Sequence, residues 1–221
     1  MAPVFTNARI LVVGASGGIG GATANAFEAA DAVVARPGRN VLDITDDGSV
    51  EAFFAANQPF DHVVVAAAHT ERGPVATLGL PDAQAAMNSK FFGAYRIAKA
   101  ARIAKGGSLT FVSGFLSQRP SAASVLQGAI NAAVEALARG LALERALVRV
   151  NTVSPGLIDT PLHADMDSAD RKAMFDRVAD RLPVHRIGQP DDVARAILFV
   201  AANPFVTGTT ITVDGGAAIA G

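Results

Sequence analysis

The chain has 221 residues, half of them hydrophobic, and carries a net charge of −1 from 19 basic and 20 acidic side chains. This length suits a single α/β domain covering residues 1–221. A nearly neutral chain without runs of like charge predicts no nucleic-acid partner and no attraction to an anionic membrane surface. The absence of cysteine excludes disulfides, thiolate catalysis and cysteine metal sites.

The first residues, "MAPVFTNARILVV", lead directly into an apolar segment without the charge pattern of a signal peptide. No apolar run reaches the length that a membrane-spanning helix needs. We therefore expect a cytoplasmic protein with no membrane partner. No cluster of side chains has the spacing of metal ligands, so we expect no metal.

Short apolar or β-branched runs alternate with longer stretches in which apolar residues recur every three or four positions. The expected strands are residues 9–13, 62–68, 108–113, 148–154 and 209–215, with a second strand that leads into residues 33–40. The expected helices are residues 18–30, 47–57, 81–104, 121–146 and 190–202. This alternation predicts one Rossmann-type domain, a doubly wound parallel α/β sheet with right-handed crossovers.

The first strand is followed at once by "GASGGIG", residues 14–20, and then by a helix. Gly14 permits a tight turn, Gly18 lets the backbone approach a diphosphate, and Gly20 allows the helix to pack closely on the strand. The helix N-terminus then presents its positive dipole end to the anion. A purely structural turn is the alternative, but the flanking strand and helix favour dinucleotide binding.

The second strand ends in "VVARPGRN", where an NAD-binding protein would place a carboxylate against the ribose 2′-hydroxyl. Arg36 and Arg39 stand there instead, and guanidinium groups suit a 2′-phosphate. This favours NADP as the cofactor. The alternative is that both arginines are only solvated loop residues.

These motifs resemble those of the short-chain dehydrogenase/reductase family over nearly the whole chain. Gly14-x-x-x-Gly18-x-Gly20 has the family's glycine spacing, "RVNTVSPGLIDTPL" is similar to its Pro-Gly segment, and "TGTTITVDGG" to its last strand. "LDITD" resembles the segment whose aspartate contacts adenine. The short path from the second strand to this segment indicates that the helix ordinarily between the family's strands 2 and 3 is deleted.

With the two arginines, the resemblance implies a set of residues that bind the cofactor. They are Gly14, Ser16, Gly18, Ile19, Gly20, Arg36, Arg39, Asp43, Ile44, Ala66, Ala67, Pro155, Gly156, Ile158 and Thr160.

The catalytic pattern of the family is missing. Its members reduce a carbonyl with a serine that binds the oxygen, a tyrosine that gives the proton, a lysine that lowers the tyrosine's pKa, and an asparagine. The residues aligned with serine, tyrosine, lysine and asparagine are, in that order, Gly114, Gln127, Asn131 and Lys90, with Asn88 two positions away from the last. Tyr95, the only tyrosine, falls in another helix.

Because a desolvated lysine can have its pKa lowered enough to act as an acid, we predict Lys90, Ser113 and Gln127 as the catalytic candidates. The alternative for Lys90 is a contact with the cofactor ribose alone. The leading hypothesis is an atypical NADP(H)-dependent oxidoreductase acting on a carbonyl or alcohol. Two others remain: a non-catalytic NADP(H)-binding protein, serving as cofactor sensor or partner subunit, and a non-redox isomerase or dehydratase.

Residues from about 160 to 188 correspond to the family's variable substrate lid, which would cover a small, apolar substrate. The long helices over residues 81–104 and 121–146 carry more alanine and apolar side chains than one sheet face covers. The family packs these helices across a twofold axis. The resemblance therefore implies a homodimer or homotetramer.

Overall fold

The computed structural model describes residues 5–220 and contains one six-stranded parallel sheet in the order β2-β1-β3-β4-β5-β6. The strands are β1 Arg9–Val13, β2 Val33–Ala35, β3 Phe60–Val65, β4 Ile103–Val112, β5 Arg149–Pro155 and β6 Thr210–Val213. The α-helices are α1 Gly18–Glu28, α2 Asp47–Ala56, α3 Leu80–Met87, α4 Gly93–Ala100, α5 Val125–Glu144, α6 Ser168–Ala179 and α7 Pro190–Ala202. Three short helices join them: the π-helix η1 Asn88–Phe92 and the 3-10 helices η2 Phe115–Ser117 and η3 Pro161–His163. The predicted doubly wound α/β fold is confirmed.

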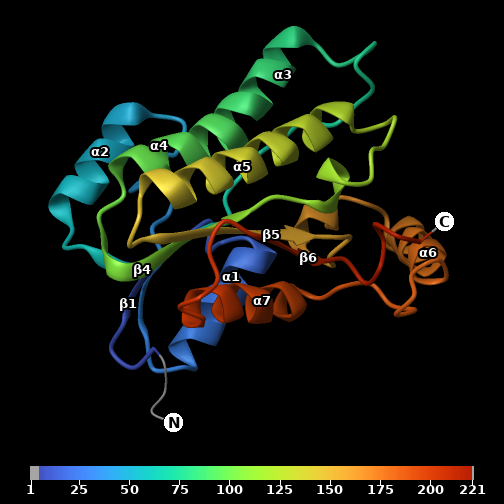
Figure 1. Cartoon of the computed structure of the whole chain (residues 1–221). Coiled ribbons are helices and arrows are strands. Elements are labelled where there is room, and N and C mark those ends of the chain that lie inside the picture. Colours follow the sequence, from blue (N-terminus) through green and yellow to red (C-terminus); the bar gives the residue numbers. More distant parts are fainter. Residues whose placement is uncertain (1–4, 221) are drawn as a thin grey trace.

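Two helical layers cover the sheet, with α2, α4 and α5 on one face and α1 and α7 on the other (Figure 1). Successive residues of β1 supply both cores, because side chains alternate along a strand. Leu11 and Val13 belong to the core under α4 and α5, whereas Ile10 and Val12 belong to the core over α1 and α7. Burial on both faces explains why this strand reads as an unbroken apolar run.

Residues 36–46 contain no helix, so the chain passes from β2 directly to the turn before α2. This agrees with the predicted deletion and leaves the three-residue strand β2 at an edge of the sheet. The single helix expected over residues 81–104 is wrong in two respects. A π-helical segment separates α3 from α4. In addition, β4 already begins at Ile103, because Phe60 N donates to Arg102 O and Ile103 pairs with Phe60 in the sheet.

The carboxyl ends of the parallel strands all lie along one edge of the sheet, on the side of the molecule that also carries α6 (Figure 1). The turns that follow β1, β3, β4 and β5 therefore meet there, as expected for a ligand site in an open α/β sheet. Among the described residues, no helix is long and apolar enough to cross a bilayer.

His62 on β3 is held inside the fold, where its Nδ1 lies 2.8 Å from Ser108 Oγ. Burial of the imidazole, together with the Arg149 guanidinium, lowers the pKa of His62 from 6.5 to about 4. Between these two pH values the unfolded chain binds a proton at this side chain and the folded chain does not. Folding stability contributed by the neutral imidazole is therefore present above pH 6.5 and is lost as the pH falls towards 4.

We expect the free energy of unfolding to decrease across this pH window by on the order of 3 kcal/mol. Denaturant titrations of the protein and of His62→Gln measure the effect, and the variant should lose most of this pH dependence. His69→Gln, at an exposed histidine, is the matched control and should behave like the unaltered protein. An unchanged pH dependence in His62→Gln would contradict the assignment.

Candidate active site at the carboxyl edge of the sheet

The glycine-rich turn after β1 is built so that only glycine fits at its first position. Gly14 has a φ of +90°, and a Cβ on it would lie 2.6 Å from the backbone nitrogen of Ala67. The turn after β1 and the end of β3 are thus in contact, as Ala66 N donating to Val13 O at 2.9 Å also shows. The predicted residues Gly14, Ala66 and Ala67 lie together.

Helix α1 begins at Gly18, and its N-cap residue Gly17 provides no side-chain cap. The first N–H groups of the helix are therefore open to an anion, which the positive end of the helix dipole favours. A Cβ on Gly18 would lie 2.9 Å from Thr160 Cγ2, so the Pro-Gly segment after β5 closes over this turn. This uncapped glycine cradle fits the diphosphate of a dinucleotide.

The two arginines after β2 are paired within the protein. Arg36 Nη2 lies 2.6 Å from Glu28 Oε2 and donates to Asn25 Oδ1 at 2.8 Å, which joins the end of β2 to α1. Arg39 donates to Asp43 at 3.2 Å and is largely exposed. Both guanidinium groups stand where the sequence analysis expected them, at the end of β2.

Asp43 is fixed mainly by Thr45, whose backbone N–H and hydroxyl both donate to its Oδ1 at 2.9 and 2.7 Å. The Thr45 hydroxyl and N–H, with a smaller effect of Arg39, hold the pKa of the Asp43 carboxyl below its ordinary value. The carboxylate is therefore charged and has a defined orientation.

The other predicted cofactor residues differ in whether their side chains are buried or exposed. Ile44 and Ile158 are buried in the cores, so only their backbone groups are free to face a ligand. Ser16 is exposed in the glycine-rich turn, and Ile19 on α1 packs partly against the core. Pro155 ends β5, and Gly156 N donates to Val213 O at 2.9 Å, which fixes the start of the Pro-Gly segment.

Lys90 is the cation of this site. It lies in the π-helix η1, a helix type that is rare and recurs at functional sites. Its ammonium donates to Ser113 O at 2.7 Å and to Asn131 Oδ1 at 2.6 Å. Burial, together with the Arg72 guanidinium, lowers the pKa of Lys90 to about 8, while Glu135 acts in the opposite direction. No further acceptor for the third N–H is recorded within residues 5–220, which leaves that proton for a ligand.

Gln127, which the sequence pattern aligns with the family's tyrosine, is 7% exposed. Its Nε2 donates to the carbonyl oxygen of Glu71, which belongs to the segment between β3 and α3. Its Oε1 is buried and has no hydrogen-bond partner among the described residues. A buried, unpartnered amide oxygen is costly unless a ligand donates to it.

The hydroxyl of Ser113 is used inside the protein. It donates to Glu135 Oε1 at 2.8 Å, and Ser117 donates to the same oxygen at 2.7 Å. The contact of Ser113 with Lys90 is made by its carbonyl oxygen instead. For the predicted catalytic candidate Ser113 to bind a substrate through its hydroxyl, that hydroxyl would have to leave Glu135. Glu135 was not among the candidates predicted from the sequence.

Gly114 leaves room for Asn131. A Cβ on Gly114 would lie 2.7 Å from Asn131 Nδ2, closer than side-chain atoms tolerate. A serine here, as in the family's pattern, is incompatible with the present position of the Asn131 amide.

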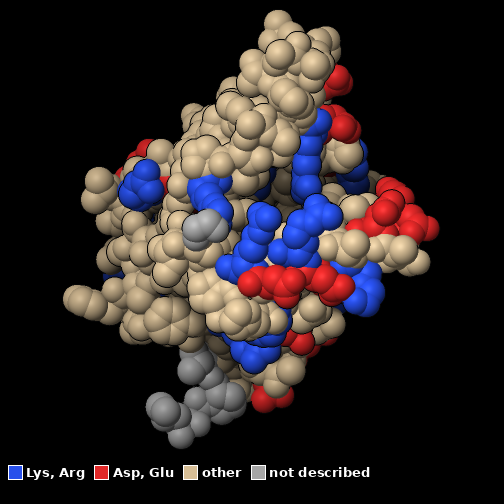
Figure 2. Space-filling model, turned by 90° about the vertical axis from the view of Figure 1, so that its right-hand side faces the viewer, with Lys and Arg blue, Asp and Glu red and all other residues tan. Residues whose placement is uncertain are grey.

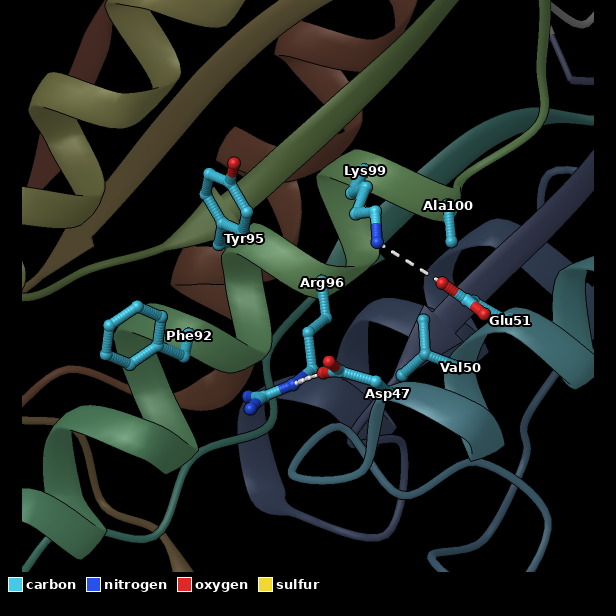
Figure 3. A pocket seen from close by; sticks show the side chains of 8 residues that line it. All are labelled: Asp47, Val50, Glu51, Phe92, Tyr95, Arg96, Lys99 and Ala100. Atoms are coloured by element: carbon cyan, nitrogen blue, oxygen red, sulfur yellow. Dashed lines mark hydrogen bonds and ion pairs between the residues drawn. The ribbon is translucent and has the colours of Figure 1, made fainter.

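Asn88 and Tyr95, the two other residues weighed by sequence, lie outside this cluster. Asn88 Oδ1 accepts from Arg96 at 2.9 Å and is thereby tied to α4. Tyr95 is half exposed in a groove between α2 and α4, beside Phe92 and the Asp47–Arg96 ion pair (Figure 3). Neither residue takes the place of the missing tyrosine.

The segment over residues 160–188 contains α6, which stands at the carboxyl edge of the sheet (Figure 1). Arg171 on α6 forms an ion pair with Asp159 and stacks its guanidinium 5.3 Å from the ring centre of Phe175. A cavity lies between this helix and the segment after β5, lined in part by Met166. Seen from this side, basic and acidic side chains lie next to one another (Figure 2).

The family model described as enoyl-(acyl carrier protein) reductase matches residues 36–218. A cis-4-hydroxycyclohexanecarboxylate dehydrogenase of Sinomonas cyclohexanicum is 31% identical and covers 98% of each chain. A 4-formylbenzenesulfonate dehydrogenase of Comamonas testosteroni is 38% identical over 50% of this chain and 46% of its own. The chain spans less than two thirds of the length of several other relatives that it matches.

A crystal structure of a small-chain dehydrogenase in complex with NADPH has 39% sequence identity to the chain and a TM-score of 0.93. It covers 96% of this chain and 99% of its own. The chain belongs to the short-chain dehydrogenase/reductase family of oxidoreductases, whose members bind a nicotinamide cofactor. The resemblance inferred from the motifs is confirmed.

Proposed function

We propose that the protein is an NADP(H)-dependent oxidoreductase that interconverts a carbonyl and an alcohol, with Lys90 as the proton-transferring group. The observation that carries this proposal is the Lys90 ammonium between Ser113 O and Asn131 Oδ1, beside the positions where the family has tyrosine and lysine. Negative charge develops on the substrate oxygen during hydride transfer. A cation at this place would stabilise that charge and could give the proton that the family's tyrosine gives.

The cofactor would supply the hydride, held by the glycine-rich turn, the end of β3 and the Pro-Gly segment. Lys90 would give its free proton to the substrate oxygen, and its pKa of about 8 suits proton transfer near neutral pH. Ser113 O and Asn131 Oδ1 keep the remaining protons in place and so fix the direction of the third. Gln127 Oε1 would accept a hydrogen bond from a hydroxyl of the substrate or product.

Two observations support NADP rather than NAD. Arg36 and Arg39 follow β2, and the two carboxylates recorded against them within residues 5–220, Glu28 and Asp43, are both paired with these arginines. A similar protein was crystallised with NADPH. A 2′-phosphate would take the place of these carboxylates as the partner of the guanidinium groups.

We expect Arg36→Ala combined with Arg39→Ala to weaken NADPH binding by about one to two orders of magnitude and to leave NADH binding within a few-fold. Fluorescence titration of both cofactors measures this. Glu28→Gln is the matched control, because it removes the ion pair but keeps Arg36. Equal affinities for the two cofactors in the unaltered protein, or an unchanged preference in the double variant, would refute the assignment.

For the substrate, we propose a small molecule with an apolar body and an acidic group. The names of two relatives describe ring compounds of this kind, a cyclohexanecarboxylate and a benzenesulfonate. Arg72 stands next to Glu71, whose carbonyl contacts Gln127, and it acts electrostatically on Lys90. A carboxylate or sulfonate is therefore favoured near these two cations, while Met166 and Phe175 offer apolar contacts from the segment that includes α6.

We expect Lys90→Met to lower kcat/KM for carbonyl reduction by about two to four orders of magnitude, with the NADPH dissociation constant within a few-fold. In the unaltered protein the reduction rate should decline above pH 8, because the ammonium there loses the proton that it must donate. Steady-state assays over a panel of aldehydes and ketones that carry an acidic group test both points. Lys105→Met, at an exposed lysine of β4, is the control and should leave kcat/KM unchanged.

Unchanged turnover in Lys90→Met would overturn the role of Lys90. NADPH binding without oxidation by any member of the panel would favour the second candidate, a non-catalytic NADP(H)-binding protein. One observation favours this second candidate: Gln127 Nε2 is occupied by Glu71 O. A substrate would first have to displace the segment between β3 and α3, to which Glu71 belongs.

We also propose that the protein is a homodimer or homotetramer that associates through α4 and α5. Phe92 and Tyr95 are 46% and 49% exposed, and Leu143 and Leu147, at the end of α5 and just beyond it, are 84% and 64% exposed. Phe92 and Tyr95 line the groove of Figure 3 beside charged pairs, an arrangement of apolar centre and polar rim common at interfaces.

Light scattering at micromolar concentration should therefore give the mass of two or four chains, and Phe92→Glu with Tyr95→Glu should shift it towards one. Phe205→Glu, at a 97% exposed side chain after α7, should leave the mass unchanged. A single-chain mass for the unaltered protein would contradict the proposal.

A further inference from the structure

Helix α5 carries a stripe of three buried polar side chains spaced four residues apart. They are Gln127, Asn131 and Glu135, which are 7%, 4% and 7% exposed. Residues at this spacing lie on one face of a helix, so all three point towards the sheet edge. The first two stand at the positions of the family's tyrosine and lysine. Glu135 has no part in the function proposed above.

A buried carboxylate is costly, and Glu135 is only partly compensated. The hydroxyls of Ser113 and Ser117 both donate to its Oε1, and within the described chain no cation is recorded in direct contact with it. Removing a carboxylate from water without a bonded counter-ion costs several kcal/mol. Burial of this kind calls for a reason besides packing.

The charge of Glu135 acts on Lys90. Within residues 5–220, the charged groups that affect the Lys90 ammonium are Arg72, on the segment after β3, and Glu135, on α5. Arg72 and burial both favour the neutral amine, and Glu135 is the charged group that acts in the opposite direction. Ser113 links the two groups directly, because its hydroxyl donates to Glu135 and its carbonyl accepts from Lys90.

We propose that Glu135 is a positioning residue that keeps Lys90 protonated and holds the turn after β4 so that Ser113 O stays on the ammonium. Its relevance to catalysis rests on the proposed function of Lys90, but its effect on Lys90 exists without turnover. Two separate properties of Glu135 are involved. The charge acts on the proton of Lys90, and the oxygen accepts the two serine hydroxyls.

Glu135→Gln separates these properties, because an amide oxygen still accepts both hydroxyls but carries no charge. We expect the pKa of Lys90 to fall by about one unit in this variant. NMR of the full-length protein with isotope-labelled lysine measures it by following the chemical shift of each side-chain Cε with pH. Lys90→Met identifies the Lys90 signal by its disappearance. No substrate is needed.

Arg72→Gln provides a second measurement with the opposite sign, since removing a neighbouring positive charge should raise the pKa of Lys90. Glu144→Gln, at an exposed carboxylate of the same helix, is the matched control and should leave the pKa unchanged. Where turnover is found, the alkaline decline of the reduction rate should move with the Lys90 pKa, to lower pH in Glu135→Gln and to higher pH in Arg72→Gln.

A Lys90 pKa in Glu135→Gln equal to that of the unaltered protein, in a variant with unchanged thermal stability, would overturn the proposal and reduce Glu135 to a structural acceptor. If Glu135→Gln fails to fold, an unshifted Lys90 pKa in Arg72→Gln would likewise count against an electrostatically controlled Lys90. Absence of turnover with a shifted pKa would instead refute the proposed function and leave this inference standing.

Discussion

The candidate active site depends on how one ammonium group is accommodated away from bulk water. Lys90 gives up hydration on entering the site, and that loss is offset by Ser113 O and Asn131 Oδ1. These acceptors come from the turn after β4 and from α5, whereas the lysine comes from the π-helix between α3 and α4. The contact therefore fixes three elements against one another at the sheet edge. The lysine nevertheless has a lowered pKa, because burial and the Arg72 guanidinium together outweigh the charge of Glu135.

The substitutions at this edge form a consistent set. By the alignment made from the sequence, Lys90 stands at the family's asparagine position and Asn131 at its lysine position, which is an exchange of the two residue types. Lys90 Nζ nevertheless donates to Asn131 Oδ1 at 2.6 Å. A cation is therefore still present at this place, but it comes from η1 instead of α5. The amide that receives it leaves no space for a side chain at position 114, which explains the glycine there. A pocket that had merely lost its function would not be expected to retain a mutually compatible group of this kind.

The sequence was sufficient where a local pattern determines local structure. The strand over residues 9–13 and the glycine turn after it were predicted, because each depends on neighbouring residues only. The absence of a helix over residues 36–46 was predicted from the short path between two segments in comparison with the family. By contrast, the sequence did not predict that the helix expected over residues 81–104 is interrupted and ends early. This break follows from the pairing of Ile103 with Phe60, which lies more than forty residues earlier in the chain, and from a π-helical turn that no side-chain pattern marks.

Glu135 was missed for a different reason. Its spacing of four from Asn131, itself four from Gln127, was readable in the sequence, but a glutamate in a helix is ordinarily assigned to the solvent face. Which positions of α5 are buried depends on the sheet beneath it, and only the structure supplies that information.

On the polar stripe of α5, the unpartnered oxygen of Gln127 is the atom to which a ligand could donate a hydrogen bond. A buried amide oxygen without a donor costs the free protein about 1–3 kcal/mol, which a hydroxyl of a bound molecule would recover. An alcohol or a hydrated carbonyl brings such a donor, whereas an apolar ligand does not. Lys90 is joined to the same helix through Asn131, so under the proposed function one ligand would meet a donor from Lys90 and an acceptor from Gln127. A hydroxyl group can satisfy both at once, and a ketone or aldehyde oxygen satisfies only the lysine. This difference favours the alcohol as the form that the site would bind more tightly, and it makes the Gln127 oxygen the group that distinguishes the two forms.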